Sequence, residues 1–195
     1  QKNKNLIMKN NELTTFYIVR HGETDWNKKK IIQGHTNSVL NETGEKQAFE
    51  AAKQLENIKF DLAFSSDLLR AKRTTEIIAL EKKLVVETTE ALRERSFGHL
   101  ENKSSQLFFD YLHTLKEKSD KERKNHKIHD GYESDEELAT RVITFLRETA
   151  IANPDKTILI GTHGGVMHVL LRHLGFITYQ ESDNLLIKNS EYIKL

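Results

Sequence analysis

Two stretches of the sequence share one layout, an apolar run of strand length that ends in basic residues and glycine. Residues 16–19 are apolar and are followed by Arg20-His21-Gly22, and the most apolar run, 157–162, is followed by His163-Gly164-Gly165. In an open parallel sheet, the carboxyl ends of the strands border the crevice in which ligands bind. We therefore expect these arginine and histidine side chains at the mouth of a site and not inside the core. A single histidine after a strand is more often an ordinary turn residue, so the argument depends on the repetition.

From the first stretch onward, the sequence alternates between strand and helix patterns. Short apolar runs predict strands at 62–65 and 84–87 and an edge strand within 184–195. Apolar residues at helical spacing predict helices at 41–56, 68–81, 104–116, 134–152 and 164–174, and segments without periodicity predict loops at 25–40 and 92–98. Strands that alternate with helices favour a parallel sheet with right-handed crossovers. The sequence therefore predicts an α/β fold, a three-layer αβα sandwich with a mostly parallel central sheet flanked by helices.

Several of these helices are expected to begin at polar capping residues. Asn41 can cap the first helix, and Ser134 with Glu137 has the spacing of a capping box. Residues 65–67 offer a cap to the helix at 68–81, and we expect Leu69 and Leu80 on its inner face. Arg70 lies in the first turn of that helix, where a cation opposes the macrodipole. An anion held there by Arg70 and the backbone N–H groups would resolve this unfavourable placement.

Length and composition limit the class of protein. At 195 residues, with 37% hydrophobic and 30% charged residues, the chain suits one domain with a well-solvated surface. We expect a frayed tail at 1–14 and a single domain at 15–195. No apolar run is long enough to span a bilayer, and a formal net charge of +1 gives no overall attraction to nucleic acid. The chain has no cysteine and no secretory signal at 1–12, so we expect a cytoplasmic location.

The strand-to-helix junctions of a parallel sheet open on one side, which would bring five side chains together: Arg20, His21, Arg70, Glu94 and His163. Two guanidinium groups and an imidazole can neutralise a phosphate monoester through bidentate hydrogen bonds. A neutral imidazole can attack phosphorus when one ring nitrogen is unprotonated, and a backbone carbonyl that accepts from the other nitrogen would fix the tautomer. We assign this nucleophilic role to His21. The hypothesis requires both histidines to face one accessible pocket.

Departure of the substrate alkoxide requires a proton, and a carboxylic acid is the usual donor. We assign this role to Glu94, with Glu101 and Glu133 as lesser candidates. Water, or a second hydroxyl group in a mutase, would then resolve the phosphohistidine. No cofactor is needed, and the sequence has no zinc-protease, EF-hand or Walker motif. The histidines spaced five residues apart from His163 onward do not stack on one helical face, so a metal site is not expected.

From residue 16 to about residue 189, the order of these motifs resembles the histidine phosphatase superfamily, in its phosphoglycerate-mutase-like branch. The similar blocks are 20–24 (Arg-His-Gly-Glu-Thr) with Trp26-Asn27, Gln33-Gly34 and Leu40-Asn41, then 65–68 with Arg70-Ala71 and Thr74, then Leu92-Arg93-Glu94 with Phe97-Gly98, and finally Thr162-His163-Gly164-Gly165. The resemblance implies that His21 is phosphorylated and that Glu94 donates the proton. It also implies a phosphate pocket made of Arg20, Asn27, Gln33, Gly34, Arg70, Glu94, His163 and the backbone of Gly164.

Two departures from the family pattern affect the wall that would face the organic part of the substrate. Leu100-Glu101-Asn102 replaces the usual Trp-Glu-Gly, and residues 130–134 replace Pro-x-Gly-Glu-Ser. We expect a metal-independent phosphomonoesterase that takes a small phosphorylated metabolite or inorganic phosphate, as a monomer or homodimer. A phosphoglycerate mutase, a sugar-bisphosphate phosphatase and a binding module without turnover stay open as alternatives. The charged residues 116–129 are either a solvated segment or a lid over the pocket.

Overall fold

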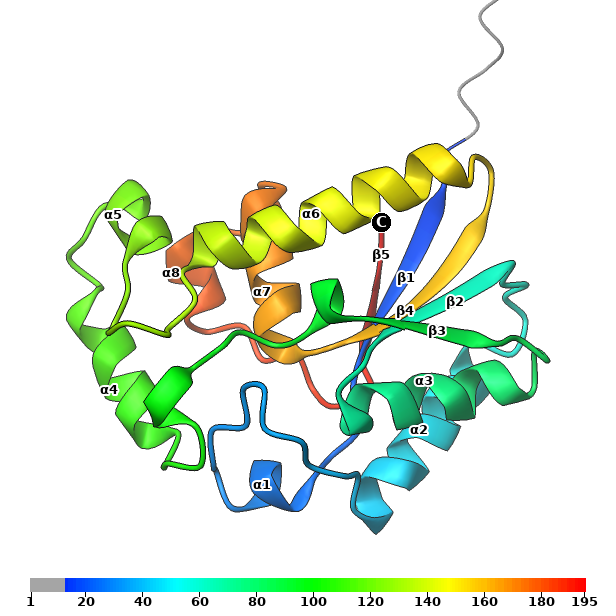
Figure 1. Cartoon of the computed structure of the whole chain (residues 1–195), viewed down its shortest axis with the longest axis horizontal. Helices are drawn as coiled ribbons and strands as arrows, with labels where there is room; N and C mark the ends of the chain where they lie inside the picture. The colour runs from blue at the N-terminus through cyan, green and yellow to red at the C-terminus, as the bar shows by residue number, and fades with distance from the viewer. Residues whose placement is uncertain (1–12) are drawn as a thin grey trace, which may run out of the picture.

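The computed structural model describes residues 13–195, and a five-stranded sheet with helices on both faces forms its centre (Figure 1). The strands are β1 (Thr15–Arg20), β2 (Leu62–Ser66), β3 (Val86–Thr89), β4 (Thr157–Thr162) and β5 (Tyr192–Lys194), in the order β3-β2-β4-β1-β5. The first four strands are parallel, and β5 pairs antiparallel with β1 at the edge. The predicted α/β sandwich with a mostly parallel sheet is therefore confirmed.

Each face of the sheet has its own apolar core, because successive side chains of a strand point to opposite faces. Phe16 and Ile18 of β1 pack with α6 (Asp135–Ala152) and α7 (Gly164–His173). Tyr17 and Val19 pack on the other face with α2 (Glu42–Gln54) and α3 (Leu69–Leu80). Figure 1 shows α6 above the sheet and α2 and α3 below it. The consecutive apolar residues of β1 thus contribute to both cores and hold the three layers together.

The capping predictions hold for two helices and are wrong for α3. The side chain of Asn41 accepts from the N–H of Gly44, and Ser134 forms the predicted capping box with Glu137. The N-cap residue of α3 is Leu68, without a side-chain cap, and Asn37 Oδ1 instead accepts from the N–H of Leu69 at 3.0 Å. The capping acceptor expected from residues 65–67 is therefore supplied by a loop residue more than thirty positions away in sequence.

Two other expectations for this region are wrong. Leu69 and Leu80 are 45% and 72% exposed, because they lie at the two ends of α3, where the helix no longer covers the sheet. The third strand occupies Val86–Thr89 and not 84–87. Its register with β2 pairs Ala63 with Val86, so the strand begins where pairing with β2 begins.

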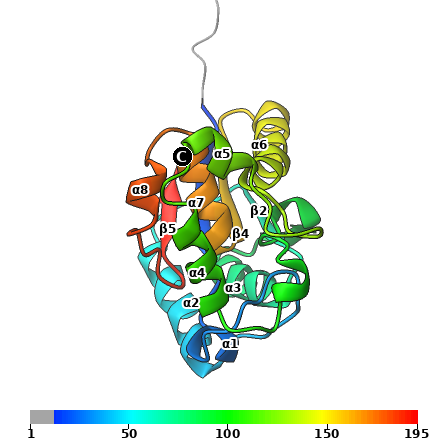
Figure 2. The same cartoon turned by 90° about the vertical axis from the view of Figure 1, so that its left-hand side faces the viewer.

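The remaining elements are short and lie outside the sandwich. They are α1 (Asp25–Lys28), two 3₁₀ turns, η1 (Glu90–Leu92) and η2 (Gly98–Leu100), and the helices α4 (Gln106–Thr114), α5 (Asp120–Asn125) and α8 (Tyr179–Ser182). The segment 25–40, predicted as a loop, thus contains a helical turn, which Thr24 and Asn27 cap. Figure 2 shows α4 and α5 at one end of the molecule, in front of α7.

The charged run at 116–127 contains the helix α5, and ion pairs connect this run to the end of α8 and to α6. Arg123 donates to Asp183 at 2.9 Å, and Lys127 donates to Glu137 at 2.6 Å. Whether 116–129 moves as a lid stays a prediction. The predicted tail at 1–14 falls mostly outside the described residues. Between residues 13 and 195, no helix has both the length and the apolar character needed to cross a membrane.

Candidate active site

His21 follows β1 directly, and backbone hydrogen bonds fix its peptide group on both sides. The N–H of His21 donates to the carbonyl of Thr162 at 2.9 Å, which extends the pairing of β1 with β4. Its carbonyl accepts from Asn189 Nδ2 at 2.9 Å, and the next N–H, of Gly22, donates to Thr74 Oγ1 at 2.9 Å. The ring atom Nδ1 lies 2.7 Å from the carbonyl oxygen of Gly22. A carbonyl can only accept, so Nδ1 carries the hydrogen and Nε2 has a free lone pair.

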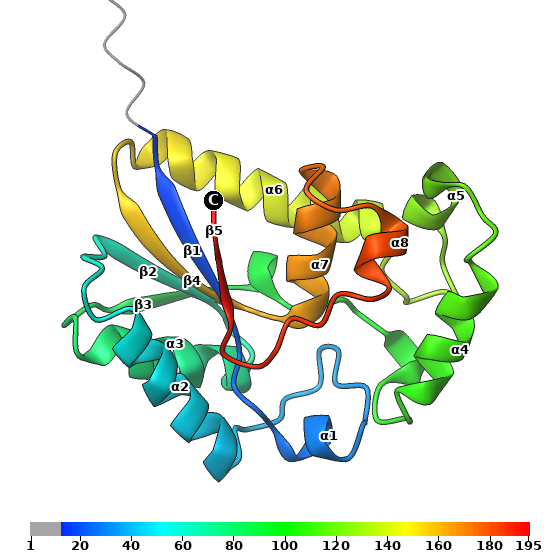
Figure 3. The same cartoon turned by 180° about the vertical axis from the view of Figure 1, so that it is seen from behind.

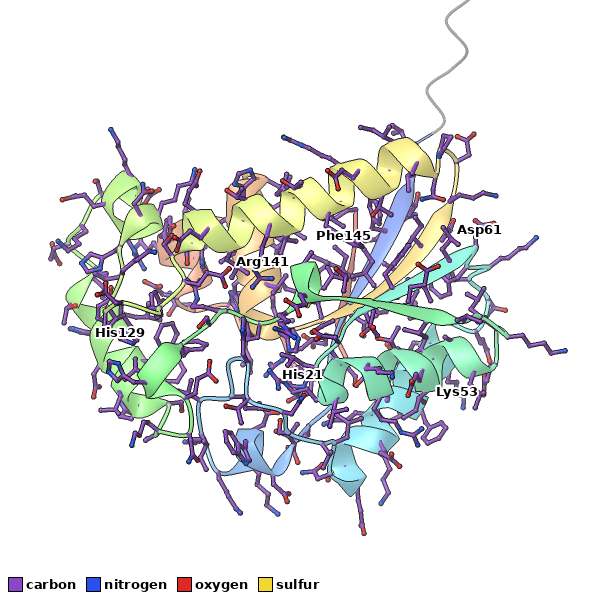
Figure 4. The ribbon with its side chains drawn as sticks, in the orientation of Figure 1. His21, Lys53, Asp61, His129, Arg141 and Phe145 are labelled. Carbon is purple, nitrogen blue, oxygen red and sulfur yellow. The ribbon has the colours of Figure 1, made fainter. Side chains whose placement is uncertain are left out.

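His163 follows β4 in the same way, and the two histidine rings are neighbours in a buried cluster of side chains. Their ring centroids lie 5.2 Å apart with an interplanar angle of 59°. Figure 4 shows His21 at the centre of the molecule, near the first turn of α3. Burial and the nearby guanidinium groups of Arg70 and Arg20 hold the pKa of both rings well below the ordinary value, so both are neutral at pH 7.

The expected open mouth of the site is wrong for this structure. His21 is 3% exposed and His163 is fully buried, although both were expected at an accessible crevice. The loop between α1 and α2 closes over them: the carbonyls of Gly34 and Thr36 accept from Arg70 at 2.7 and 2.9 Å. Figure 1 shows this blue loop rising toward the N-terminal end of α7. Sequence patterns place strand ends on one side of a sheet, but they do not show which loop folds back across it.

Arg20 and Arg70 reach this cluster from β1 and α3. Arg70 is fully buried, and burial lowers its pKa to about 10, so the guanidinium stays protonated at pH 7. Arg20 is largely buried and donates to the carbonyl of Ile187, and burial lowers its pKa too. At this site, four buried nitrogens lack a hydrogen-bond partner within residues 13–195: Nε of Arg20, Nε of Arg70 and both ring nitrogens of His163. Buried donors without partners are costly, and a bound oxyanion would accept from both Nε–H groups and from the one N–H of neutral His163.

Glu94 reaches the same cluster from the loop after β3. Its carboxylate accepts from the N–H of Gly165 at 3.0 Å and from the N–H of Arg95 at 2.8 Å. Thr162 Oγ1 donates to the carbonyl of Leu92 at 2.8 Å, which holds this loop against the end of β4. The structure thus brings together all five residues that the sequence assigned to the site.

The two lesser candidates for the proton donor have other roles. Glu101 accepts four hydrogen bonds, from the N–H groups of His35, Thr36 and Phe97 and from Thr36 Oγ1, at 2.8 to 3.2 Å. Glu133 forms a bidentate ion pair with Arg141 at 2.7 and 2.9 Å. Both side chains therefore hold the walls of the site in place.

Three other predicted phosphate-binding residues, Asn27, Gln33 and Gly34, interact with neighbouring residues of the protein itself. The Asn27 side chain accepts from Thr24 and caps α1, and Gln33 Oε1 accepts from Ser38 Oγ at 2.5 Å. Gly34 has φ +49°, and a Cβ there would lie 2.2 Å from Glu101 Oε1, so only glycine fits between the loop and that carboxylate. Contact with phosphate stays a prediction for these residues and for Gly164.

Sequence reasoning missed three residues that position the site: Thr74, Arg141 and Asn189. Arg141 of α6 donates to the backbone carbonyls of Ala91 and Glu94, both at 2.9 Å, and lies above His21 in Figure 4. The sequence did contain an indication of Arg141, because this charged residue stands among the apolar positions of the helix that face the sheet. Thr74 belonged to the sequence block around Arg70 but was given no role, and Asn189 gave no such signal, since both act on the backbone of a distant segment.

The described residues contain no cluster of three or more His, Asp or Glu side chains that could hold a metal ion. Glu94 and the two histidines are arranged around guanidinium groups, whose positive charge would oppose a metal ion. The charge of this pocket suits an anion.

The comparisons with known proteins agree with this geometry. The family model of the histidine phosphatase superfamily, branch 1, matches residues 16–195. The uncharacterized phosphatase PhoE of Bacillus subtilis is 35% identical over 162 residues, which cover 83% of this chain and 78% of that protein. The probable phosphoglycerate mutase GpmB of Cronobacter sakazakii is 34% identical over 173 residues, with 85% and 77% covered. Mycobacterial glucosyl-3-phosphoglycerate phosphatase with VO3 has a TM-score of 0.78 at 26% identity, with 92% and 90% covered.

Proposed function

The chain belongs to the histidine phosphatase superfamily, branch 1, and on this premise we propose that it is a metal-independent phosphomonoesterase that works through a phosphohistidine on His21. Membership and the relatives make it an enzyme with phosphatase- or mutase-like activity on small phosphorylated substrates. The proposal adds the mechanism and the direction of the reaction. One observation carries it. His21 Nδ1 donates a hydrogen bond to the carbonyl of Gly22, so Nε2 is the unprotonated ring atom, and it lies among donors that have no partner.

Binding uses the positive charge that the fold has buried. The phosphate dianion would take the free donors of Arg20 and Arg70 and an N–H of His163. These groups are fixed before the substrate arrives, so little reorganisation is needed when charge shifts in the transition state. The loop that covers Arg70 has to move for access, because Gly34 and Thr36 hold it closed.

The chemical steps follow from the positions of His21 and Glu94. The lone pair of His21 Nε2 forms a bond to phosphorus, the ester P–O bond breaks, and the leaving alkoxide takes a proton from the Glu94 carboxyl group. A water molecule then gives its proton to Glu94 and bonds to phosphorus while the P–N bond breaks. Inorganic phosphate leaves, and both side chains return to their starting states.

The test is the covalent intermediate. Incubation with a ³²P-labelled ester and rapid quenching should give an acid-labile, base-stable label on the wild type and none on His21→Ala. His173→Ala, in the last turn of α7, is the matched control and should keep the label. A wild type that releases phosphate without such a label would refute the phosphohistidine mechanism, and one that releases none from any ester would favour a binding module.

A mutase is the second candidate, because GpmB of Cronobacter sakazakii is a probable phosphoglycerate mutase. Here the phosphate on His21 would return to a second hydroxyl group and not to water. The interval between Glu94 and His163 is short for the extra basic residues that hold a bisphosphate, which favours hydrolysis. Incubation with 3-phosphoglycerate and a bisphosphoglycerate primer decides: isomerisation faster than phosphate release would defeat the phosphatase proposal.

A further inference from the structure

Two backbone N–H groups from different segments hold the carboxyl group of Glu94. The N–H of Arg95, the next residue, donates to Oε1 at 2.8 Å, and the N–H of Gly165, in the first turn of α7, donates to Oε2 at 3.0 Å. The orientation of this carboxyl group therefore depends on how the loop at Arg95 lies relative to the start of α7. A proton donor has to lie within hydrogen-bond reach of the atom that it protonates, so this orientation matters for the reaction.

The side chain of Arg95 attaches its loop to the start of α6. It is 4% exposed, and its guanidinium donates to the carbonyl of Glu133 at 2.6 Å and to the carboxylate of Asp135, the first residue of α6. The guanidinium carbon also lies 5.2 Å from the centroid of the Tyr132 ring. Three contacts with one short segment fix this arginine, and its backbone N–H is fixed with it.

Asp135 also holds the second segment. Arg172, in the last turn of α7, donates to the other carboxylate oxygen at 2.6 Å, and the hydroxyl of Tyr179, in α8, donates to that same oxygen at 2.9 Å. Figure 3 shows α7 with α6 and α8 beside it. Arginines from the two segments that hold Glu94 therefore meet on one carboxylate.

The surroundings of Asp135 make this junction strong. Burial favours the neutral form of the carboxyl group, but the charges of Arg95 and Arg172 and the hydrogen bonds from Arg95 and Tyr179 outweigh burial and hold the pKa of Asp135 below its ordinary value. All three charged side chains are largely buried, so solvent screens their ion pairs little. Removal of the shared carboxylate would leave both guanidinium groups without their charged partner.

We propose that Asp135 is a positioning residue for proton transfer: by binding Arg95 and Arg172 together, it sets the orientation in which Glu94 meets the leaving oxygen of the substrate. The inference rests on the proposed function, in which Glu94 is the proton donor. The helix α7 moves as one unit, so a shift at Arg172 is transmitted to Gly165, about 10 Å away along the axis. A displacement of about 1 Å at a reacting group can lower the rate about 100-fold.

This role has a kinetic signature that a loss of folded enzyme does not have. Phenyl phosphate and p-nitrophenyl phosphate have similar shapes, but phenolate is a stronger base than p-nitrophenolate and depends more on an acid when it leaves. A misplaced Glu94 would therefore slow the phosphorylation of His21 more with phenyl phosphate than with p-nitrophenyl phosphate. Partial unfolding would lower both rates by the same factor.

Rapid-quench measurement of the phosphohistidine gives the rate of this first step with each ester. Asp135→Asn should slow labelling from phenyl phosphate roughly 10-fold and from p-nitrophenyl phosphate less than about 3-fold, within the contribution of general acid catalysis. Arg95→Lys keeps the charge but lacks the fork that reaches both Glu133 and Asp135, so it should shift the ratio of the two rates in the same direction and carries the test if Asp135→Asn does not fold. Asp183→Asn is the matched control, because Asp183 pairs with the buried Arg123 of α5, and it should leave the ratio unchanged.

A double-mutant cycle with Glu94→Gln shows whether Asp135 acts through the acid. Without an acid at residue 94, Asp135→Asn should not change the ratio of the two rates any further. An unchanged ratio in Asp135→Asn and Arg95→Lys, or a further change of the same size in the Glu94→Gln background, would overturn the positioning role. A label on His21 of the wild type would show that the phosphohistidine mechanism still stands in that case. Equal slowing of both esters by Glu94→Gln would instead refute Glu94 as the proton donor, and circular dichroism of each variant checks its folding.

Discussion

Replacing Thr74 with valine tests whether the turn that holds His21 depends on a single hydroxyl group. Thr74 Oγ1 accepts from the N–H of Gly22 at 2.9 Å and donates to the carbonyl of Arg70 at 2.8 Å, and all three groups are buried. Valine has nearly the same shape, so the substitution leaves no cavity. It leaves the N–H of Gly22 without an acceptor, which costs about 1–3 kcal/mol of unfolding free energy. The second bond adds little, because it is a local helix contact.

Urea denaturation measures this cost, with an unchanged m-value as evidence that the two-state transition is preserved. Thr149→Val is the matched control, since Thr149 is also buried in a helix but its hydroxyl has no hydrogen-bond partner within residues 13–195. Thr74→Val should lose about 1–3 kcal/mol relative to this control, and its kcat should fall because the His21–Gly22 peptide is less firmly held. Equal stabilities of the two variants would refute the reasoning.

Three further substitutions probe the walls of the site. Glu101→Gln removes charge-assisted acceptors from the loop at Thr36, so amide exchange there should accelerate and KM should rise more than kcat falls. The pKa of His168 falls from 6.5 to about 4 on folding, so between these pH values the unfolded chain binds more protons than the folded chain. The free energy of unfolding therefore decreases as the pH is lowered. His168→Gln should reduce this decrease, measured by urea titration between pH 7.5 and 5, by up to about 2 kcal/mol. Gly161→Ala would place a Cβ 1.7 Å from Thr75 Oγ1 and should destabilise by about 1–3 kcal/mol, with partial recovery when Thr75→Ala is added.

The sequence was sufficient for the architecture and for the central residues of the site. The continuous apolar runs of β1 and β4 predicted a parallel sheet, and parallel strands place Arg20, His21 and His163 at the same edge. These predictions succeed because they depend only on period and direction along the chain. The position of the N-cap of α3 failed because it is set by Asn37, on a segment whose path no local pattern describes.

The closure of the pocket was beyond sequence reasoning for the same reason. Glu101 was considered as an acid, yet its carboxylate holds His35 and Thr36, and this contact brings the loop over Arg70. Charge and residue type cannot distinguish a carboxylate that reacts from one that accepts four backbone and hydroxyl donors. Only the three-dimensional path of the loop makes that distinction.

The last residues of the chain complete the site that the first strand begins. Arg20 donates to Ile187, the side chain of Asn189 holds the carbonyl of His21, and β5 pairs with β1. During translation, the reactive histidine therefore emerges from the ribosome long before the groups that orient it. A chain cut short by a premature stop codon ahead of residue 187 would lack these contacts, so full catalytic competence requires that synthesis has passed this segment.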